Sequence, residues 1–402
     1  MTTRRPRILF ISHHGTLSGA PISLLTLMKY YQQNRNWDFR MLMRKAGPLR
    51  TEYEKLAPTM IYYPHYLSPT DMRPAGVVGP EPSGFDKLTK KAKQWRHQQL
   101  IKKWVHDYEP DLIYSNTSVN GDILKNLGSP ASVLVHVREL WTTIDLYNDT
   151  QRTAFANPNY RYFAVSHFVK EYLHDKHNIE PERISIVPGS VEPESFDARA
   201  AEKSDDQIRA ELNIPRDSFI VGGIGSIDSR KGVDIFVDAA QQTIMANPER
   251  DIRFVWVGAG GMRGELEKNI AKTGLETRII FTGERKNPYP YLKTFNLGLM
   301  TSRDDPFPRS VLEMAAFGTP IICFKGVGGA PEFVSDDAGI VLENFDPAEM
   351  ANAITSILDN DDLAAKFSAT GSQKAREKYN TNTVGANATA LLDELLARYQ
   401  GR

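Results

Sequence analysis

The sequence predicts an α/β protein made of two doubly wound parallel sheets, one in each half of the chain. Short apolar runs alternate with helical patterns along its whole length, and this alternation is typical of β-α-β units. At 402 residues the chain is too long for one ordinary core and suits two domains of roughly 200 residues each. A turn-rich stretch at 188–193 separates the halves, so we expect domains at 1–190 and 191–380. We expect the remaining helix, at 381–402, to cross back to the first domain.

Each predicted strand is a short run of β-branched, aromatic or other apolar residues between turn residues. In the first half these runs lie at residues 7–12, 37–43, 111–115, 132–137, 160–165 and 184–187. In the second half they lie at residues 219–227, 253–257, 278–282, 297–300, 320–324 and 339–342. From residue 346 onward the pattern is helical. Sheets of this kind bind ligands at the carboxyl ends of their strands.

The composition is that of a globular protein without a general affinity for nucleic acid. Basic and acidic residues balance at 49 each, so no overall positive field favours that partner. No apolar run approaches the roughly 20 residues that span a bilayer, and the first run, at 8–11, is too short for a signal peptide. The single cysteine, Cys323, lies in an apolar run and is expected in the core. We therefore expect a cytoplasmic protein.

Residues 305–332 carry the pattern that bears most directly on chemistry. Two carboxylates eight positions apart, Asp305 and Glu313, flank a proline-rich turn and the first turn of an apolar helix. A Gly-Thr-Pro turn at 318–320 then leads into a strand, and a glycine-rich turn at 328–332 opens another helix. Helix N-termini offer unpaired N–H groups to phosphate, and carboxylates accept hydrogen bonds from sugar hydroxyls. The stretch therefore predicts a sugar-nucleotide pocket.

Two glycine-containing turns follow predicted strands of the second half. The turn at 225–232 holds Gly225, which lets the backbone approach a phosphate, and the bases Arg230 and Lys231, whose charge suits a diphosphate leaving group. The alternative is a plain strand–helix loop with two solvated bases. In the second turn, around Gly258, no acidic residue follows at the distance that a dinucleotide-binding fingerprint requires. We expect this turn to line the pocket of the nucleotide base.

Polar residues also end predicted strands of the first half. Gly19 lies at the start of the first helix, where it could admit a phosphate to the helix N-terminus. His136 closes the strand at 132–137, and α/β proteins place site residues at such ends, although a structural histidine is the alternative. Residues 115–117 end another strand in the same way. None of His13, His14 and His136 stands at a metal-ligand spacing such as HExxH, so we predict no metal.

Two further segments of the first half suggest contacts with an acceptor or a membrane. Between Tyr66 and Phe85, four prolines and three glycines exclude a helix, so this loop is either an acceptor-side lid or simply mobile. From Lys87 to Lys103 the chain carries seven bases and no acid around Trp95, which is typical of a helix that touches anionic lipid. The alternative is a solvated basic helix. One side of the helix is expected to pack under the next strand: Leu100, Ile101, Trp104 and Val105.

Together these residues resemble the retaining glycosyltransferases of the GT-B fold, in the large family of glycosyl transferases group 1 that includes bacterial cell-envelope enzymes. The likeness covers nearly the whole chain and is strongest over 222–334. The family's E-x7-E signature falls on Asp305 and Glu313, and its GxxxxxKG loop falls on 225–232. Its Gly-Thr-Pro and GGxPE turns are present as well. The resemblance implies two Rossmann-like domains that face each other across a cleft.

The resemblance also implies a role for each site residue. Glu313 would hold the ribose hydroxyls, Asp305 would bind the transferred sugar, and Lys231 would neutralise the diphosphate. His136 would contact the donor sugar from the first domain, which makes His136, Lys231 and Asp305 the expected catalytic residues. The expected donor-binding residues are Gly19, Gly225, Arg230, Lys231, Gly258, Phe307, Pro308, Arg309, Ser310 and Glu313.

Two positions depart from the family's pattern. Asp305 stands where the family usually has Glu, which shortens the reach of the carboxylate by one methylene group. Ser226 stands where Arg is frequent, so the second positive charge must come from Arg230, Arg309 or elsewhere. Both changes leave in place the groups that transfer requires, so we expect an active protein.

The chemistry implied is transfer of a sugar from a nucleotide-diphosphate donor to a glycan or lipid-linked acceptor, in bacterial surface polysaccharide synthesis at the inner face of the membrane. The family retains the anomeric configuration by front-face attack, in which the leaving phosphate takes the acceptor's proton. No metal, cofactor or protein nucleophile is then needed. One alternative is a GT-B sugar-nucleotide epimerase, which needs acid and base groups between the domains. Another is a non-catalytic nucleotide-sugar-binding module, which predicts loss of Lys231 or Glu313.

Overall fold

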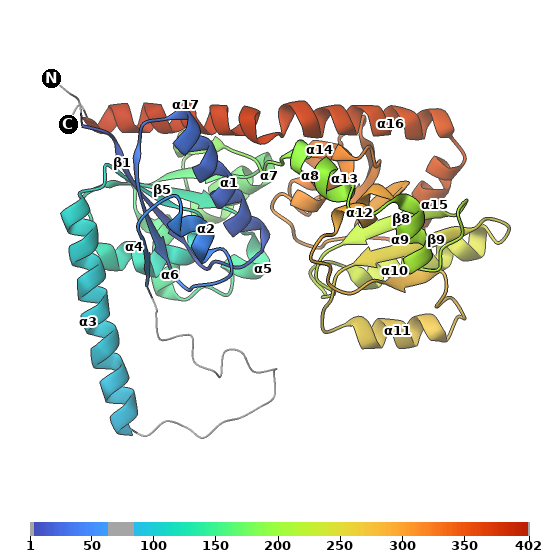
Figure 1. Ribbon diagram of the computed structural model, residues 1–402, viewed down its shortest axis with the longest axis horizontal. Coiled ribbons are helices and arrows are strands. Elements are labelled where there is room, and N and C mark those ends of the chain that lie inside the picture. Colours follow the sequence, from blue (N-terminus) through green and yellow to red (C-terminus); the bar gives the residue numbers. More distant parts are fainter. Residues whose placement is uncertain (1–3, 63–83, 401–402) are drawn as a thin grey trace.

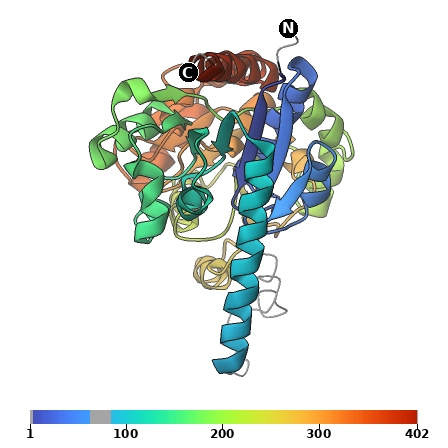
Figure 2. The same ribbon diagram turned by 90° about the vertical axis from the view of Figure 1, so that its left-hand side faces the viewer.

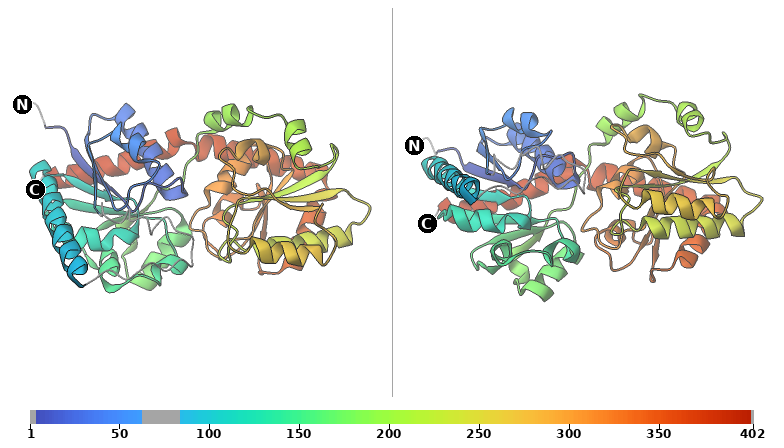
Figure 3. Two further views of the ribbon diagram at one scale, coloured as in Figure 1. Left: turned by 60° about the horizontal axis from the view of Figure 1, so that its bottom comes forward. Right: turned by 90° about the horizontal axis from the view of Figure 1, so that it is seen from below.

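The computed structural model describes residues 4–62 and 84–400, which form two α/β units joined end to end (Figure 1). In each unit the strands of one sheet all run parallel, and apolar clusters lie on both faces of that sheet. This confirms the predicted fold class of two doubly wound parallel sheets. Seen from below, the two units lie side by side and meet at a narrow waist (Figure 3).

Among the described residues, the first sheet has seven strands in the order β3-β2-β1-β4-β5-β6-β7. Their bounds are β1 (Arg7–Ser12), β2 (Asp38–Met43), β3 (Thr59–Ile61), β4 (Leu112–Ser115), β5 (Ser132–Val137), β6 (Arg161–Ala164) and β7 (Ile184–Ile186). Six of these strands match the predicted ones to within one residue at either end. The sequence does not predict β3, because three residues are too few to show an alternating pattern.

The second sheet has six strands in the described part of the chain, in the order β10-β9-β8-β11-β12-β13. Their bounds are β8 (Phe219–Ile224), β9 (Ile252–Val257), β10 (Ile279–Phe281), β11 (Leu297–Met300), β12 (Ile321–Phe324) and β13 (Gly339–Leu342). The predicted strand 219–227 is too long, because Gly225 has a φ of +147° and turns the chain out of the sheet. The order reverses between β1 and β4 and between β8 and β11, the points where open parallel sheets bind ligands.

Helices connect the strands and cover the sheets. In the first unit they are α1 (Gly19–Asn34), α2 (Arg50–Glu54), α3 (Gly84–Tyr108), α4 (Gly121–Leu127), α5 (Trp141–Ile144), α6 (Asp149–Ala156) and α7 (His167–His177). In the second they are α8 (Pro193–Ala200), α9 (Asp205–Glu211), α10 (Val233–Ala246), α11 (Arg263–Ala271), α12 (Tyr289–Lys293), α13 (Arg309–Ala316), α14 (Ala330–Val334), α15 (Pro347–Leu358) and α16 (Asp361–Gln373). Short 3-10 turns lie at Ser118–Asn120 and Pro181–Arg183.

The C-terminal helix α17 (Thr381–Gln400) returns to the first unit. Together α16, a π-helical turn at Lys374–Lys378 and α17 form a rod along one side of both units (Figure 1). The buried residues of α17 lie in the same apolar cluster as Leu24 and Met28 of α1: Val384, Ala388, Leu392 and Leu396. A β-bridge between Val191 and Asn380 pairs the two segments that pass between the units.

The helix α3 extends away from the first unit (Figures 1 and 2). Ile101 and Val105 are buried in the unit's core, whereas Trp95 and Leu100 are 61% and 59% exposed. The expectation that Leu100 packs under the neighbouring strand is therefore wrong, because the helical rotation of about 100° per residue carries it away from Ile101. No described helix is long and apolar enough to cross a membrane.

The predicted loop between Tyr66 and Phe85 lies outside the described residues, apart from Gly84 and Phe85, which begin α3.

The single cysteine, Cys323, is fully buried in β12, as expected. Burial also raises the pKa of its thiol well above the ordinary value, which keeps the sulfur uncharged.

Candidate active site

The predicted phosphate loop begins where β8 ends. A Cβ on Gly225 would lie 3.1 Å from Cε of Lys231, so the glycine lets the lysine side chain fold back over the strand end. A Cβ on Gly258, which follows β9, would meet the carbonyl oxygen of Gly225 at 1.9 Å. The two glycine turns that the sequence singles out are therefore in direct contact, at the carboxyl edge of the second sheet.

The loop brings its two bases to the first carboxylate of the motif. Nζ of Lys231 lies 2.6 Å from Oδ2 of Asp305, and Nη1 of Arg230 lies 3.8 Å from the same oxygen. The side chains of Lys231 and Asp305 are only 13% and 12% exposed, which strengthens their attraction compared with a surface pair. Arg230 also donates to the carbonyl oxygen of Asp304 at 2.9 Å. Lys231 and Asp305, which lie 74 residues apart in sequence, thus form one cluster with Arg230.

The second carboxylate, Glu313, lies on the buried side of α13. Its Oε1 accepts hydrogen bonds from Nε of Arg309 at 2.8 Å and from the hydroxyl of Tyr289 at 3.3 Å. Burial and the nearby Glu313 carboxylate raise the pKa of Tyr289 to about 12, so the phenol keeps its proton. Arg309 in turn lies over the ring of Phe196, 5.7 Å from its centre. The structure thus holds Glu313 in a defined orientation, while its role toward ribose remains a prediction.

Phe307, in the predicted sugar-binding turn, packs at the junction of the two units. Its ring lies against Gly189 of the link between the units and stacks on Tyr379 at 5.5 Å. A Cβ on Gly329 would clash with the Phe307 ring at 2.4 Å, which explains the glycine at that position. Pro308 precedes α13 as its N-cap residue, and Arg309 and Ser310 are its first two residues. The backbone groups expected to bind the sugar are therefore anchored by the Phe307 side chain.

Hydrogen bonds at three places join this stretch to the loops that follow β5 and β6 of the first unit. Oδ2 of Asp304 accepts from N and Oγ1 of Thr142 at 3.0 and 2.6 Å. Ser166, the N-cap of α7, donates to the carbonyl oxygen of Pro306 at 2.9 Å. The carboxylate of Glu332 accepts from the backbone N–H groups of His167 and Phe168, the first two residues of α7, at 2.9 and 2.7 Å.

The carboxylate of Glu332 thus lies at the N-terminus of α7, where the helix dipole favours a negative charge. Sequence reasoning includes Glu332 in the GGxPE turn, but it does not show that this residue caps a helix of the other unit. Asp304 and Thr142 are missed altogether. The only signal for Asp304 is its position beside Asp305 in a motif. All three contacts join residues that follow strand ends, so the carboxyl edges of the two sheets face each other.

His136 lies near the carboxyl end of β5, as expected, and is bound on both sides by other groups of the first unit. Its side chain is fully buried, its Nδ1 lies 2.6 Å from the Tyr114 hydroxyl, and its Nε2 lies 3.0 Å from the carbonyl oxygen of Val187. Nε2 must donate to that carbonyl, so Nδ1 is an acceptor and the ring is neutral. Burial, with the Arg138 charge, holds its pKa well below the ordinary value. The protein itself thus binds both ring nitrogens of His136, and its expected contact with the donor sugar stays a prediction.

Arg138 and Glu139, the next polar residues, bind other polar groups at that edge. Arg138 donates from Nε to Oδ1 of Asn116 at 3.0 Å and from Nη2 to Nδ1 of His136 at 3.2 Å. The carboxylate of Glu139 accepts from Thr117 and Ser118. Sequence reasoning names this strand end for its histidine and does not consider the arginine two residues later, whose bonds the structure shows.

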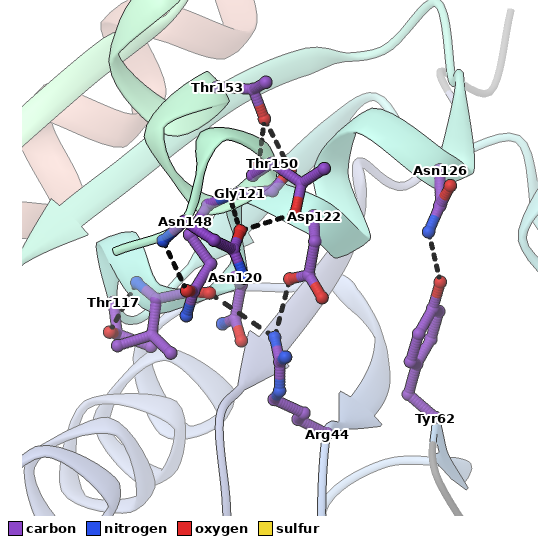
Figure 4. Close-up of polar contacts among 12 residues, drawn as sticks. Arg44, Tyr62, Thr117, Asn120, Gly121, Asp122, Asn126, Asn148, Thr150 and Thr153 are labelled. Carbon is purple, nitrogen blue, oxygen red and sulfur yellow. Dashed lines mark hydrogen bonds and ion pairs between the residues drawn. The ribbon is translucent and has the colours of Figure 1, made fainter. Parts of the chain in front are cut away.

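A second polar network supports the segments after β2 and β4 (Figure 4). Nη1 of Arg44 lies 2.6 Å from Oδ1 of Asp122, and Asn126 donates to the Tyr62 hydroxyl at 3.0 Å. Thr117 caps the 3-10 turn Ser118–Asn120 by accepting from the backbone of Val119. Within the described ranges, no three His, Cys, Asp or Glu side chains are grouped as a metal site would require.

Comparison with known proteins agrees with this division into two units. The sequence matches the family described as Glycosyltransferase Family 4 over residues 17–195 and the family described as Glycosyl transferases group 1 over residues 204–374. It is 26% identical to a poly(ribitol-phosphate) alpha-N-acetylglucosaminyltransferase of Staphylococcus aureus, over 41% of this chain and 33% of that protein. It is 30% identical to a D-inositol 3-phosphate glycosyltransferase of Acidothermus cellulolyticus, over 46% of this chain and 43% of that protein. The alignments thus span a third to about half of the length of such relatives.

Solved structures resemble the whole chain. The Anabaena protein Alr3699/HepE in complex with UDP superposes with a TM-score of 0.75 at 20% identity, over 96% of this chain and 100% of that one. WaaG, a glycosyltransferase involved in lipopolysaccharide biosynthesis, superposes with a TM-score of 0.68 at 13% identity, over 96% and 99% of the two chains. At these identities the likeness establishes the shared GT-B fold of two facing Rossmann-like units.

Proposed function

The chain belongs to the glycosyl transferases group 1 family, and on this premise we propose that it is a retaining glycosyltransferase that uses a nucleotide-diphosphate sugar. The observation that carries the proposal is the cluster of Lys231, Arg230 and Asp305 at the carboxyl edge of the second sheet. Two bases beside a helix N-terminus suit a diphosphate, and a carboxylate beside them suits a sugar hydroxyl. The edge of the first sheet faces this cluster.

In the proposed reaction, the bond between C1 of the sugar and the diphosphate oxygen breaks while the acceptor oxygen bonds to C1 on the same face. The acceptor's proton passes to the departing phosphate oxygen. Lys231 and Arg230 stabilise the charge that develops on the diphosphate, and Asp305 orients the sugar. Glu313 would hold the ribose, and the loop around Gly258 would lie beside the base. This scheme needs neither a metal nor a protein nucleophile.

The experiment is to incubate the protein with UDP-, GDP-, dTDP- and ADP-sugars and to measure nucleoside diphosphate release with and without candidate acceptors. Release with one donor, in the presence of an acceptor, and an α-linked product from an α-linked donor are expected. An inverted product would contradict retention, and activity abolished by EDTA and restored by magnesium would contradict the metal-free scheme. Epimerised donor without transfer would favour the epimerase, and binding without any turnover would favour the non-catalytic module.

We further propose that the acceptor is a glycan or a lipid-linked sugar of a bacterial surface polysaccharide. Relatives named for poly(ribitol-phosphate) and for a lipopolysaccharide core support this class. The helix α3 supports it as well, because it extends from the first unit and exposes Trp95 among bases that include Lys93 and Arg96. We therefore propose peripheral contact between α3 and the anionic inner face of a membrane.

A further inference from the structure

A groove of about 550 Å³ opens on the second unit where three neighbouring strands end. It is lined by the first two turns of α10 and by the segments that follow β11, β12 and β13. Its volume falls within the roughly 300–1,000 Å³ of small-molecule sites. The proposed transfer reaction uses none of its side chains. The lining residues on which an assignment depends are Asp234, Asp238, Arg303, Val327 and Phe345.

The helix α10 offers two carboxylates to the groove, Asp234 and Asp238, which lie four positions apart on one face. Arg303 donates to both oxygens of Asp234, from Nη1 at 2.8 Å and from Nη2 at 2.6 Å, and so fixes its orientation. A carboxylate accepts about four hydrogen bonds, so Asp234 keeps capacity for further donors. In the described part of the chain, Asp238 is exposed and its carboxylate makes no hydrogen bond or ion pair. Partial burial and the neighbouring Asp234 raise the pKa of Asp238, which indicates that the fold compensates its charge poorly.

The segment after β13 supplies an aromatic ring to the same groove. Phe345 is 40% exposed, whereas Phe324, the last residue of β12, is fully buried. The two rings stack with their centres 4.1 Å apart and their planes 25° apart. This stacking holds the Phe345 ring in place and leaves the exposed part of its surface to solvent. A fixed apolar ring beside hydrogen-bonding groups suits the flat face of a sugar, which carries mainly C–H groups.

Backbone hydrogen bonds connect the groove to the cluster of Lys231, Arg230 and Asp305. The backbone N–H of Arg303 donates to the carbonyl oxygen of Arg230 at 2.8 Å. The backbone N–H of Asp305 donates to the carbonyl oxygen of Val327 at 2.8 Å. Two lining residues of the groove are thus each one hydrogen bond away from a residue of the cluster. A molecule held at the cluster therefore has the groove next to it.

We propose that this groove binds the glycan chain of the acceptor, at sugar units remote from the hydroxyl that receives the new sugar. The two carboxylates accept hydrogen bonds from sugar hydroxyls, and Phe345 offers an apolar surface to a sugar ring. The negative charge of Asp238 favours neutral or amino sugars over acidic ones, and it disfavours the diphosphate of a second nucleotide. Binding at two places raises the affinity for long acceptors above that for short ones. That the glycan is the acceptor rests on the proposed function, whereas glycan binding itself does not.

The direct test is a saturation-transfer NMR titration of the full chain, without donor, with neutral hexasaccharides of glucose, galactose, mannose and N-acetylglucosamine. We expect at least one of them to bind, and Phe345→Ala to weaken that binding about fivefold, because the stacked ring is lost. Phe345→Tyr should retain the binding, because the ring stays. Asp238→Asn should weaken it about threefold, since an amide accepts hydroxyl bonds less strongly than a carboxylate.

The matched control is Met245→Ala, because Met245 is an exposed apolar residue near the other end of α10. Since Phe345 also packs on Phe324, Asp238→Asn provides the variant that leaves the packing of the fold intact. Absence of binding to the wild type overturns the proposal. Affinities of Phe345→Ala and Asp238→Asn equal to that of the wild type overturn it as well.

Transfer kinetics with acceptors of increasing length test whether the bound glycan is the acceptor. In the wild type, KM should fall as the acceptor becomes longer. Asp238→Asn and Phe345→Ala should raise the KM for a long acceptor about threefold to fivefold, without a change in kcat or in the KM for the shortest acceptor. Equal KM values of wild type and variants for long acceptors would overturn the acceptor assignment. If the wild type transfers no sugar from any donor, the proposed function fails, and the NMR titration still decides whether the groove binds a glycan.

Discussion

The ammonium group of Lys231 is held 2.6 Å from Asp305, so the residue expected to meet the diphosphate is also tied to the residue expected to meet the sugar. We expect Lys231→Ala to lower turnover by about a hundredfold or more, because it removes charge stabilisation that is felt most as the diphosphate departs. Binding of the bare nucleoside should change little. Steady-state release of nucleoside diphosphate measures the effect. Lys325→Ala, which breaks the exposed pair with Glu343, is the matched control, and equal turnover in the two variants would remove Lys231 from the reaction.

For Glu313, we expect a substitution to have a smaller effect than for Lys231. Glu313→Gln should weaken nucleotide binding several-fold, because a neutral amide accepts ribose hydroxyl bonds less strongly than a carboxylate. Part of the loss should come from Arg309, which would lose its ionic partner on the same helix. Calorimetry with a nucleoside and its diphosphate separates the contributions, because a ribose contact should affect both ligands alike. Identical affinities in wild type and variant would exclude Glu313 from the ribose site.

Buried histidines make stability depend on pH. Burial holds the pKa of His136 well below its ordinary value of 6.5 and lowers that of His13 to about 3, so both stay neutral in the fold and are protonated in the unfolded chain below pH 6.5. Stability is therefore complete above pH 6.5 and decreases as the pH falls, by up to about 1.4 kcal/mol per pH unit for each such histidine. Urea midpoints between pH 7.5 and 5 measure this slope. His136→Gln should flatten it, whereas replacing the exposed His106 by Gln should flatten it less.

At the scale of elements, α3 has one side that is buried in the first unit and one side that exposes large apolar residues. Its buried side holds Ile101 and Val105, and its outer side exposes Trp95 and Leu100. Local periodicity predicts the helix, but it assigns Leu100 to the wrong side, because the helical rotation of about 100° per residue carries Leu100 away from the buried Ile101. Similarly, periodicity predicts β8 and extends it too far, since Gly225 has a positive φ and turns the chain out of the sheet.

We expect the full chain to bind anionic vesicles at low salt and to be released as salt screens the charges. Replacing Lys93 and Arg96 by Glu and Trp95 by Ala should abolish this binding, because each base near the surface contributes about 1 kcal/mol. Nucleotide affinity should not change. The control exchanges Lys268 and Lys272, exposed bases at the end of α11 in the second unit, for Glu. Vesicle co-sedimentation measures the effect, and a wild type that ignores anionic vesicles would make α3 a solvated helix.

At the scale of the whole molecule, the contacts between the units come from the same stretch that contains the donor motif. Asp304, Pro306 and Glu332 all bind groups of the first unit. The proposed donor site and these contacts between the units therefore belong to one stretch of the chain. Phe307 reinforces this link by its packing between Gly189 and Tyr379.

Glu332→Ala should loosen the contact between the units. It removes the carboxylate that caps α7, a contribution of about 1 kcal/mol, and leaves the N–H groups of His167 and Phe168 to solvent. Hydrogen exchange at these two amides should become several-fold faster, and small-angle scattering should show a larger radius of gyration. Glu343→Ala, which removes an exposed carboxylate of the second unit, is the control. Unchanged exchange at both amides would show that the contact does not hold the units together.

The sequence by itself determined the two-sheet architecture, nearly all strands and the motif residues of the second unit. These depend on periodicity, on turn residues and on the spacing of Asp305 and Glu313, which are all local. Tertiary structure alone decided the surroundings of His136, because its ring nitrogens lie against Tyr114 of β4 and Val187, which follows β7. It also decided the contacts between the units, whose partners lie 162 and 165 residues apart in sequence. Spacing along the chain carries no information about such pairs, since they meet only when both sheets have formed and packed.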